Sequence, residues 1–232
     1  MSAFSQVIEY SAKHPKPADI TFEYGTAGFR TIGETLESTV FRAGLLAALR
    51  SQSKQGQVIG VMVTASHNHE RDNGVKLVDP MGEMLQQSWE GYCTDIANAS
   101  SDAQVVDILA SIVKLEGIDL SVQPKVAYAR DTRPSGPLLQ AALEDGLSAL
   151  NVEATNFGIV TTPQLHYFSV VDSLVAKFPR GRSFVRPSGT EDAVRVYAEA
   201  ATRSDCDQLA YAVAGAVFDQ AGGRGERPAE FL

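Results

Sequence analysis

Apolar residues recur along this chain in two spacings, which predict alternating strands and helices. Short β-branched runs at residues 58–63 and 125–129 indicate buried strands. Residues 38–54 space their apolar side chains by three or four, as helices do. The order strand, charged turn, helix and strand over residues 125–160 predicts a βαβ unit with parallel strands. Further helices are predicted at 4–12, 85–99, 103–115, 138–150 and 206–221, and further strands at 75–78, 152–160 and 194–198.

The composition narrows the class of protein. The chain has 232 residues, of which 44% are hydrophobic and 21% charged, as in soluble globular proteins. Its net charge of −8 argues against a nucleic-acid or membrane partner, because both are polyanionic. Cys93 and Cys206 lie far apart, which argues against a disulfide framework. With no long apolar segment at the start of the chain, we expect a cytoplasmic protein.

The strand at 58–63 breaks into Thr64-Ala65-Ser66-His67-Asn68, which places a serine at the mouth of a buried strand. A hydroxyl on a loop held by rigid structure is a candidate nucleophile, and His67 and Lys76 are polar neighbours. Most serines after strands only cap or turn the chain. The sequence has no GxSxG elbow, so an α/β-hydrolase is not supported. These residues alone leave a structural and a catalytic role open.

Two stretches combine small residues with arginine. Arg30 follows two glycines three residues apart, and such glycines let the backbone pass close to an anion. Near the other end, Arg186 and Arg195 bracket a loop whose amides and hydroxyls can satisfy phosphate oxygens from several directions. The small residues of this loop are Pro187, Ser188, Gly189 and Thr190.

Other polar residues favour simpler roles. Arg130 and Asp131 open a charged turn at a strand's carboxyl end, where α/β sheets place ligands. Their mutual pairing to fix the turn is the favoured interpretation. His14 lies in a proline-containing lead-in, and we expect it to be solvated.

These strings resemble those of the α-D-phosphohexomutases. The serine string, continued by Asp72-Asn73-Gly74-Val75-Lys76, is similar to the loop whose phosphoserine donates its phosphoryl group to a sugar phosphate. The string ending at Arg30 is similar to the family's N-terminal active-site segment. The loop at 186–195 is similar to the one that grips the substrate's non-reacting phosphate. The family usually has proline where this chain has His69, which frees φ and predicts a looser loop.

The resemblance covers nearly the whole chain and implies its domains. Residues 1–168 look like the family's first domain, a mixed βαβ domain with the phosphoserine loop. Residues 169–232 look like its last, a small α+β phosphate-binding domain. The continuation from Gly74 to Leu85 looks closest to the members that interconvert N-acetylglucosamine 6-phosphate and 1-phosphate for UDP-N-acetylglucosamine synthesis. A hexosamine phosphate is therefore the expected substrate.

The resemblance also implies roles for single residues. Ser66 would carry the phosphoryl group and contact the metal. His67, Asn68 and Arg30 would organise the loop and its charge, and Lys76 would either transfer a proton or stabilise charge. The substrate's non-reacting phosphate would be anchored by a second set of residues, in the loop at 186–195. That set is Arg186, Pro187, Ser188, Gly189, Thr190 and Arg195.

The family's cofactor is Mg²⁺, but the three-aspartate loop that holds it and the sugar-recognition loop are absent from this sequence. Ser66 alone gives too few ligands to hold the ion firmly. Phosphoryl transfer depends on neutralising charge, so we expect little turnover. The alternative is a non-catalytic phosphosugar-binding or interaction fragment. Surfaces that the absent domains would cover favour self-association.

Overall fold

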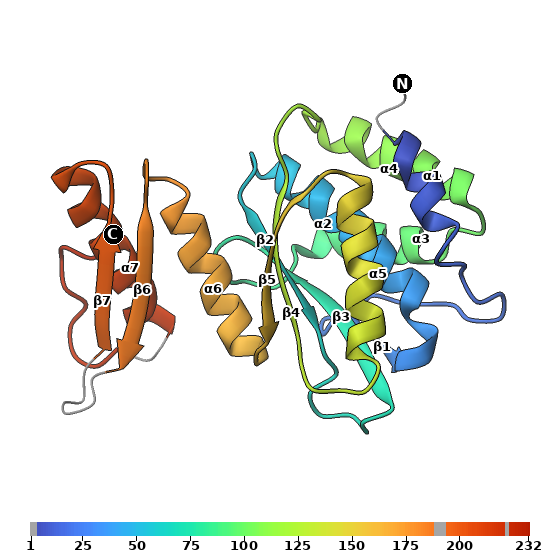
Figure 1. Cartoon of the computed structure of the whole chain (residues 1–232), viewed down its shortest axis with the longest axis horizontal. Helices are drawn as coiled ribbons and strands as arrows, with labels where there is room; N and C mark the ends of the chain where they lie inside the picture. Colours follow the sequence, from blue (N-terminus) through green and yellow to red (C-terminus); the bar gives the residue numbers. More distant parts are fainter. Residues whose placement is uncertain (1–3, 188–193, 221–222) are drawn as a thin grey trace. The chain divides into compact units, whose positions relative to one another are not determined.

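The chain folds into two compact units in the computed structural model (Figure 1). The first unit is Met1–His166 and the second is Tyr167–Leu232, and each is described by itself. The boundary predicted after residue 168 falls inside a helix, α6 (Thr162–Val175), and stays a prediction about the family's domains. The residues described are 4–187, 194–220 and 223–232.

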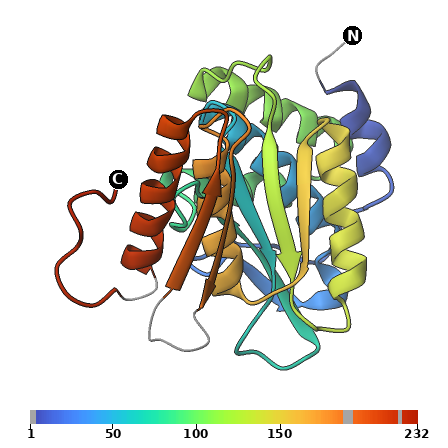
Figure 2. The same cartoon turned by 60° about the vertical axis from the view of Figure 1, so that its left-hand side comes forward.

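The first unit is built on a mixed five-stranded sheet with the order β1-β3-β2-β4-β5. Strand β4 runs parallel to both β2 and β5, and these three strands lie side by side in Figure 2, whereas β3 is antiparallel to β1 and β2. The predicted βαβ unit and the mixed α/β class are confirmed. The strands are β1 (Phe29–Ile32), β2 (Val58–Val63), β3 (Asp72–Val78), β4 (Lys125–Arg130) and β5 (Glu153–Ile159).

Strand β2 was predicted with its observed bounds because all six of its residues are apolar or glycine. All six are buried in the structure. Strand β1 was not predicted, since it is short and its burial is interrupted. Gly28 precedes it with a φ of 81°, a conformation that glycine adopts at little cost. A Cβ on Gly28 would lie 2.3 Å from the Val75 carbonyl oxygen. The glycine therefore allows β1 to lie against β3.

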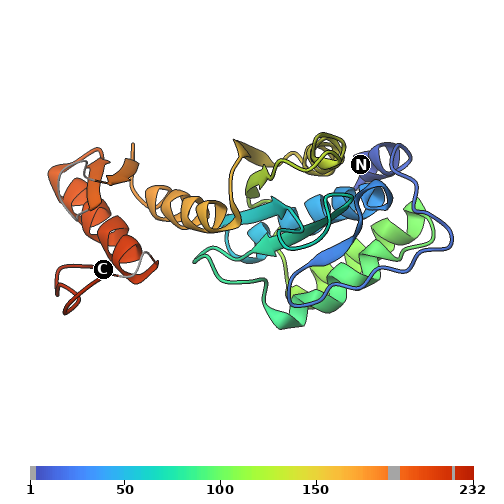
Figure 3. The ribbon, with the colours of Figure 1, turned by 90° about the horizontal axis from the view of Figure 1, so that it is seen from below.

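Helices cover this sheet in a close stack. Helix α2 lies between α5 on one side and α3 and α4 on the other, and it also packs on β2 (Figure 3). Residues Ser38 to Gln52 of α2 are all buried as a result. The helices of the first unit are α1 (Ser5–Ser11), η1 (Gly33–Thr35), α2 (Glu37–Ser53), α3 (Gln87–Ala97), α4 (Asp102–Glu116) and α5 (Gly136–Ala149).

A buried ion pair anchors the turn after β3. Arg50 on α2 donates from Nε to Asp79 at 2.8 Å, and both side chains are 3% exposed. The Arg50 guanidinium also lies 4.7 Å from the ring centroid of Trp89, a cation–π contact. Trp89 is buried, whereas Tyr92 is only partly buried and packs edge-on against it.

The expectation that His14 is solvated is wrong. Its ring nitrogens lie 2.9 Å from Glu37 and 3.1 Å from Asp145, and its ring stacks on Phe41. Only 7% of the residue is exposed. Its partners are 23 and 131 residues away in the sequence, so no local pattern could have predicted them.

The second unit joins a helix pair to a hairpin. Strands β6 (Arg182–Pro187) and β7 (Val194–Glu199) pair antiparallel, and α7 (Arg203–Gln220) packs against them. Its core unites Val170 and Leu174 of α6 with residues of α7. In the described part of the chain, no helix combines the length and apolarity needed to span a membrane.

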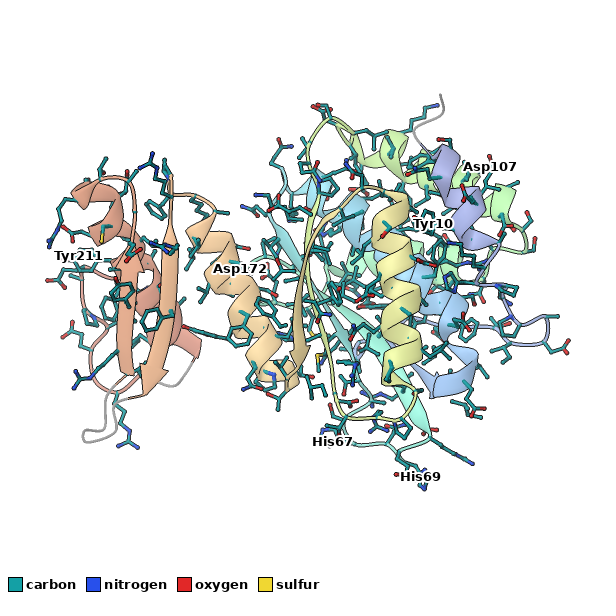
Figure 4. The ribbon with its side chains drawn as sticks, viewed as in Figure 1. Tyr10, His67, His69, Asp107, Asp172 and Tyr211 are labelled. Carbon is teal, nitrogen blue, oxygen red and sulfur yellow. The ribbon has the colours of Figure 1, made fainter. Side chains whose placement is uncertain are left out.

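Asp172, on α6 (Figure 4), gives a test of this packing. Burial raises the pKa of its carboxyl group. The folded protein therefore keeps this proton to higher pH than the unfolded chain, and stability falls as pH rises through the folded pKa. We expect Asp172→Asn to raise the free energy of unfolding at neutral pH by on the order of 1 kcal/mol. The gain should vanish in acid, below the unfolded pKa.

Urea unfolding at several pH values measures this gain. Asp207→Asn, at a half-exposed position on α7 where the carboxylate pairs with Arg203, is the control and should not give this gain. Equal urea midpoints for Asp172→Asn and the unchanged protein at neutral pH would contradict the assignment.

Candidate active site

The loop between β2 and β3, residues 64–71 and here called the serine loop, lies where the two parallel strands β2 and β4 end side by side. An open pocket of about 720 Å³ occupies this edge. Carboxyl ends of parallel strands are where α/β sheets bind ligands. Four predicted site residues line the pocket together: Arg30, Ser66, His67 and Lys76. Figure 4 shows His67 at this end of the unit.

Two cations reach the pocket from neighbouring strands. Arg30 lies on β1 and Lys76 on β3, and Arg30 Nη1 donates to Asn68 Oδ1 at 3.4 Å. Burial, and secondarily the charge of Arg30, lowers the pKa of the Lys76 ammonium group. The two charges favour an anionic ligand such as phosphate. The lowered pKa makes Lys76 a readier proton donor than an ordinary lysine.

A short chain of oxygens leads from Ser66 into the wall of the pocket. Ser66 Oγ lies 3.3 Å from Thr64 Oγ1, and Thr64 Oγ1 donates to Asp131 Oδ2 at 2.6 Å. Thr64 was not predicted as a site residue, and Asp131 was named only as part of a turn that either lies near a ligand or is fixed by pairing with Arg130. The sequence position of Asp131 does indicate a site residue, because Asp131 directly follows β4 and the carboxyl ends of neighbouring parallel strands meet at one edge of the sheet.

The predicted pairing of Arg130 with Asp131 is wrong in its partner. The Asp131 carboxylate instead pairs with Arg133, whose Nε lies 3.1 Å from Oδ2, and the Arg133 amide donates to Oδ1. Arg130 donates from Nε to Gln140 and from Nη1 to the carbonyl oxygen of Asp131. The turn after β4 folds the chain so that the Arg133 side chain reaches the Asp131 carboxylate. The side chains of adjacent residues such as Arg130 and Asp131 cannot meet in this way.

Arg133 also fixes the serine loop. Its Nη1 and Nη2 groups donate to four backbone carbonyl oxygens at distances between 2.6 and 3.0 Å, and its side chain is 10% exposed. Such a fork can be made only by a guanidinium group. The presence of His69 in place of proline predicted a looser loop. In the structure the His69 carbonyl oxygen accepts a hydrogen bond from Arg133, which holds the loop at this residue. The four carbonyl groups belong to Ala65, Asn68, His69 and Asp72.

The second set of predicted residues lies in the second unit. Arg186 of β6 and Arg195 of β7 are cross-strand partners, and Pro187 is opposite Val194. Ser188, Gly189 and Thr190 lie outside the described residues. The hairpin thus brings the two arginines of the predicted phosphate loop to adjacent positions on its strands.

Two family models match the chain. The model of the alpha/beta/alpha domain I of phosphoglucomutase/phosphomannomutase matches residues 32–104 and 98–174, and that of the C-terminal domain matches residues 138–216. The chain belongs to the α-D-phosphohexomutase family. This phosphohexomutase chain is 51% identical over 161 residues to phosphoacetylglucosamine mutase of Mus musculus, and 46% identical over 177 residues to that of Candida albicans.

These matches cover most of the phosphohexomutase chain but a minority of each relative. They span 69% and 72% of this chain, and 29% and 32% of the mouse and Candida proteins. An N-acetylglucosamine-phosphate mutase in its substrate complex has a TM-score of 0.71 at 47% identity, covering 73% of this chain and 32% of that one. The Aspergillus fumigatus N-acetylphosphoglucosamine mutase has a TM-score of 0.69 at 45% identity, covering 75% and 32%.

The Aspergillus structure is a complex with N-acetylglucosamine 6-phosphate and magnesium. In this phosphohexomutase chain, no three acidic, histidine or cysteine side chains of the described ranges are grouped to hold a metal ion. Asp131 lines the pocket, but its two carboxylate oxygens already accept hydrogen bonds from Thr64 and Arg133. The described residues therefore do not form a Mg²⁺ site. No step below is assigned to the metal.

Proposed function

We propose that this chain performs phosphoryl exchange between Ser66 and hexosamine phosphates, the chemistry of phosphoacetylglucosamine mutase, in the cytoplasm. The observation that carries the proposal is the convergence of Ser66, Arg30, His67 and Lys76 on one pocket. Relatives that share 44–51% identity with the chain are phosphoacetylglucosamine mutases. Their names supply the substrate class, N-acetylglucosamine phosphates.

In the forward half of the reaction, a substrate hydroxyl attacks phosphorus on phosphorylated Ser66. The phosphorus–Oγ bond breaks, and the sugar becomes a bisphosphate. Arg30 and Lys76 offset the negative charge on the transferring oxygens. His67, on the same loop, contributes to orienting the group. The reverse half returns a phosphoryl group from the other end of the sugar, which completes an isomerisation of 6-phosphate to 1-phosphate.

The second unit would hold the phosphate that does not react, because the sugar must stay bound while its other end exchanges. We assign this role to the loop at 186–190 with Arg195, and we place the junction of the two family domains after residue 168. Guanidinium groups bind phosphate through two parallel hydrogen bonds, which suits such an anchor. We assign magnesium no residue other than phosphorylated Ser66.

A second candidate is a phosphosugar-binding protein without turnover, possible partners being further copies of itself. It is favoured by the missing metal ligands among the described residues. To separate the two, the chain phosphorylated on Ser66 is mixed with N-acetylglucosamine 6-phosphate and followed by ³¹P NMR. Transfer predicts loss of the phosphoserine signal and appearance of a sugar bisphosphate. Binding without any loss of phosphoserine would favour the second candidate.

The pH dependence of transfer tests the role of Lys76. When Ser66 takes a phosphoryl group from a sugar bisphosphate, the Lys76 ammonium group would donate a proton to the departing sugar oxygen and offset charge, so the rate in this direction should fall as pH rises through its lowered pKa. We expect Lys76→Arg to be slower and to lose this alkaline limb, because a guanidinium stays protonated but gives up no proton. Initial rates measured from neutral to alkaline pH check this. An unchanged alkaline limb in Lys76→Arg would assign it to another group.

A further inference from the structure

The oxygens of Ser66, Thr64 and Asp131 form a connected path from the nucleophile to a carboxylate. The second link is the short one, 2.6 Å from Thr64 Oγ1 to Asp131 Oδ2. The first, 3.3 Å from Ser66 Oγ to Thr64 Oγ1, is longer than a usual hydroxyl pair. Catalytic hydrogen bonds are often long before substrate binds and shorten in the reacting complex. Ser66 and Thr64 both line the pocket.

The direction of the protons on this path follows from counting donors. A carboxylate paired with a guanidinium has no proton to give, so Thr64 must use its one hydroxyl proton on Asp131. The Thr64 oxygen is then left as an acceptor facing Ser66. The Ser66 hydroxyl is thereby oriented as the donor, with one of its lone pairs turned away from Thr64 and available for attack.

We propose that Asp131 takes the Ser66 hydroxyl proton through Thr64 when Ser66 accepts a phosphoryl group, and returns it by the same path when Ser66 gives that group away. This inference rests on the proposed function. In protein kinases an aspartate likewise accepts the proton of the attacking hydroxyl. Here Thr64 touches the reacting atom, and Asp131 acts through Thr64.

The step balances in atoms and protons. As Ser66 Oγ forms its bond to phosphorus, its proton passes to Thr64 Oγ1, and the proton of Thr64 passes to Asp131 Oδ2. The phosphorus–oxygen bond to the sugar breaks, and the sugar oxygen takes a proton from Lys76. Lys76 and Asp131 are restored when the same proton transfers run in reverse, as Ser66 gives its phosphoryl group to a sugar hydroxyl. Arg133, which holds both Asp131 and the serine loop, keeps the path aligned.

Two rates test the path in the full chain. One is phosphoryl uptake by Ser66 from N-acetylglucosamine 1,6-bisphosphate. The other is covalent labelling of unphosphorylated Ser66 by a fluorophosphonate, which needs removal of the serine proton but no sugar. We expect Thr64→Val and Asp131→Asn to slow both rates by about tenfold to a hundredfold. Thr64→Ser keeps a hydroxyl and should restore most of the rate.

The pH profile separates this path from a merely structural effect. In the unchanged protein both rates should show an acid limb, and Asp131→Asn should abolish that limb. Arg133 faces the carboxylate directly, and Arg30, His67 and Lys76 line the same pocket. Asp107→Asn is the matched control, because Asp107 lies on α4 at the opposite end of the unit (Figure 4).

The outcomes for the two proposals differ. Labelling that depends on Thr64 and Asp131, without uptake from the bisphosphate, would sustain the path and refute the proposed function. Uptake with labelling and transfer rates unchanged in Thr64→Val and Asp131→Asn would sustain the function and refute the path. A Ser66 that the fluorophosphonate does not label at all would also refute the path.

Discussion

Replacing Ser66 with alanine is expected to abolish phosphoryl exchange while leaving sugar-phosphate binding in place. In the proposed reaction Ser66 Oγ is the atom that bonds to phosphorus, so its removal takes away the nucleophile. The loss should be at least about a thousandfold in the rate of uptake from the sugar bisphosphate. Binding should persist because Arg30 and Lys76, which supply the charge, are unchanged. Intact mass measures uptake, and calorimetry measures binding of N-acetylglucosamine 6-phosphate.

The matched control for this variant is Ser121→Ala, an exposed hydroxyl that contacts Asp119 in a surface turn. It should take up phosphate at the rate of the unchanged chain. If Ser66→Ala still gained a phosphoryl group, Ser66 would not be the acceptor. If it lost binding together with uptake, the serine would be part of the ligand's grip and its role as the nucleophile would be unproven.

Arg133→Ala is expected to give the second largest loss. Its guanidinium group makes hydrogen bonds to four backbone carbonyl groups, and a hydrogen bond made by a charged group contributes about 1.5–3 kcal/mol. The serine loop should therefore shift, and a misplacement of about 1 Å can cost roughly a hundredfold in rate. We expect a loss of about that size in phosphoryl uptake. Trypsin should also cleave faster after Arg71, an exposed residue of the same loop.

Two controls separate loop position from charge. Arg133→Lys keeps the charge but lacks the planar fork, so it should remain impaired. Guanidinium ion added at low concentration should partly restore uptake in Arg133→Ala but not in Ser66→Ala. Full activity of Arg133→Lys would show that the charge alone matters. Unchanged trypsin cleavage after Arg71 in Arg133→Ala would contradict its role in holding the loop.

The parts of the fold that the sequence predicted are those with a local cause. Strand β2 is one apolar run between polar residues, and the βαβ unit of β4, α5 and β5 is a regular alternation. Strand β1 could not be predicted without knowing where β3 lies, because Gly28 is required by the close approach of the chain to Val75 on β3. The buried position of His14 could not be predicted either, because its partners Glu37 and Asp145 come near it only in the folded chain.

The residues of the candidate site also divide into those that a short sequence pattern predicts and those that only the fold brings together. Ser66, Lys76 and Arg30 could be named from the sequence because each stands in a short string that resembles one of the family's. Thr64 and Asp131 are 67 residues apart and meet because β2 and β4 are neighbours in the sheet. Arg133 was passed over for Arg130 because its partners are backbone carbonyl groups, which leave no trace in side-chain identity.

One measurement tests the central claim that this chain exchanges phosphoryl groups at Ser66. The purified chain, dephosphorylated beforehand, is incubated with N-acetylglucosamine 1,6-bisphosphate, and the product is analysed by intact mass and peptide mapping. Our account predicts the gain of one phosphoryl group, located on Ser66 and removed again by N-acetylglucosamine 6-phosphate. No gain of phosphate, or phosphate on another residue, would contradict it.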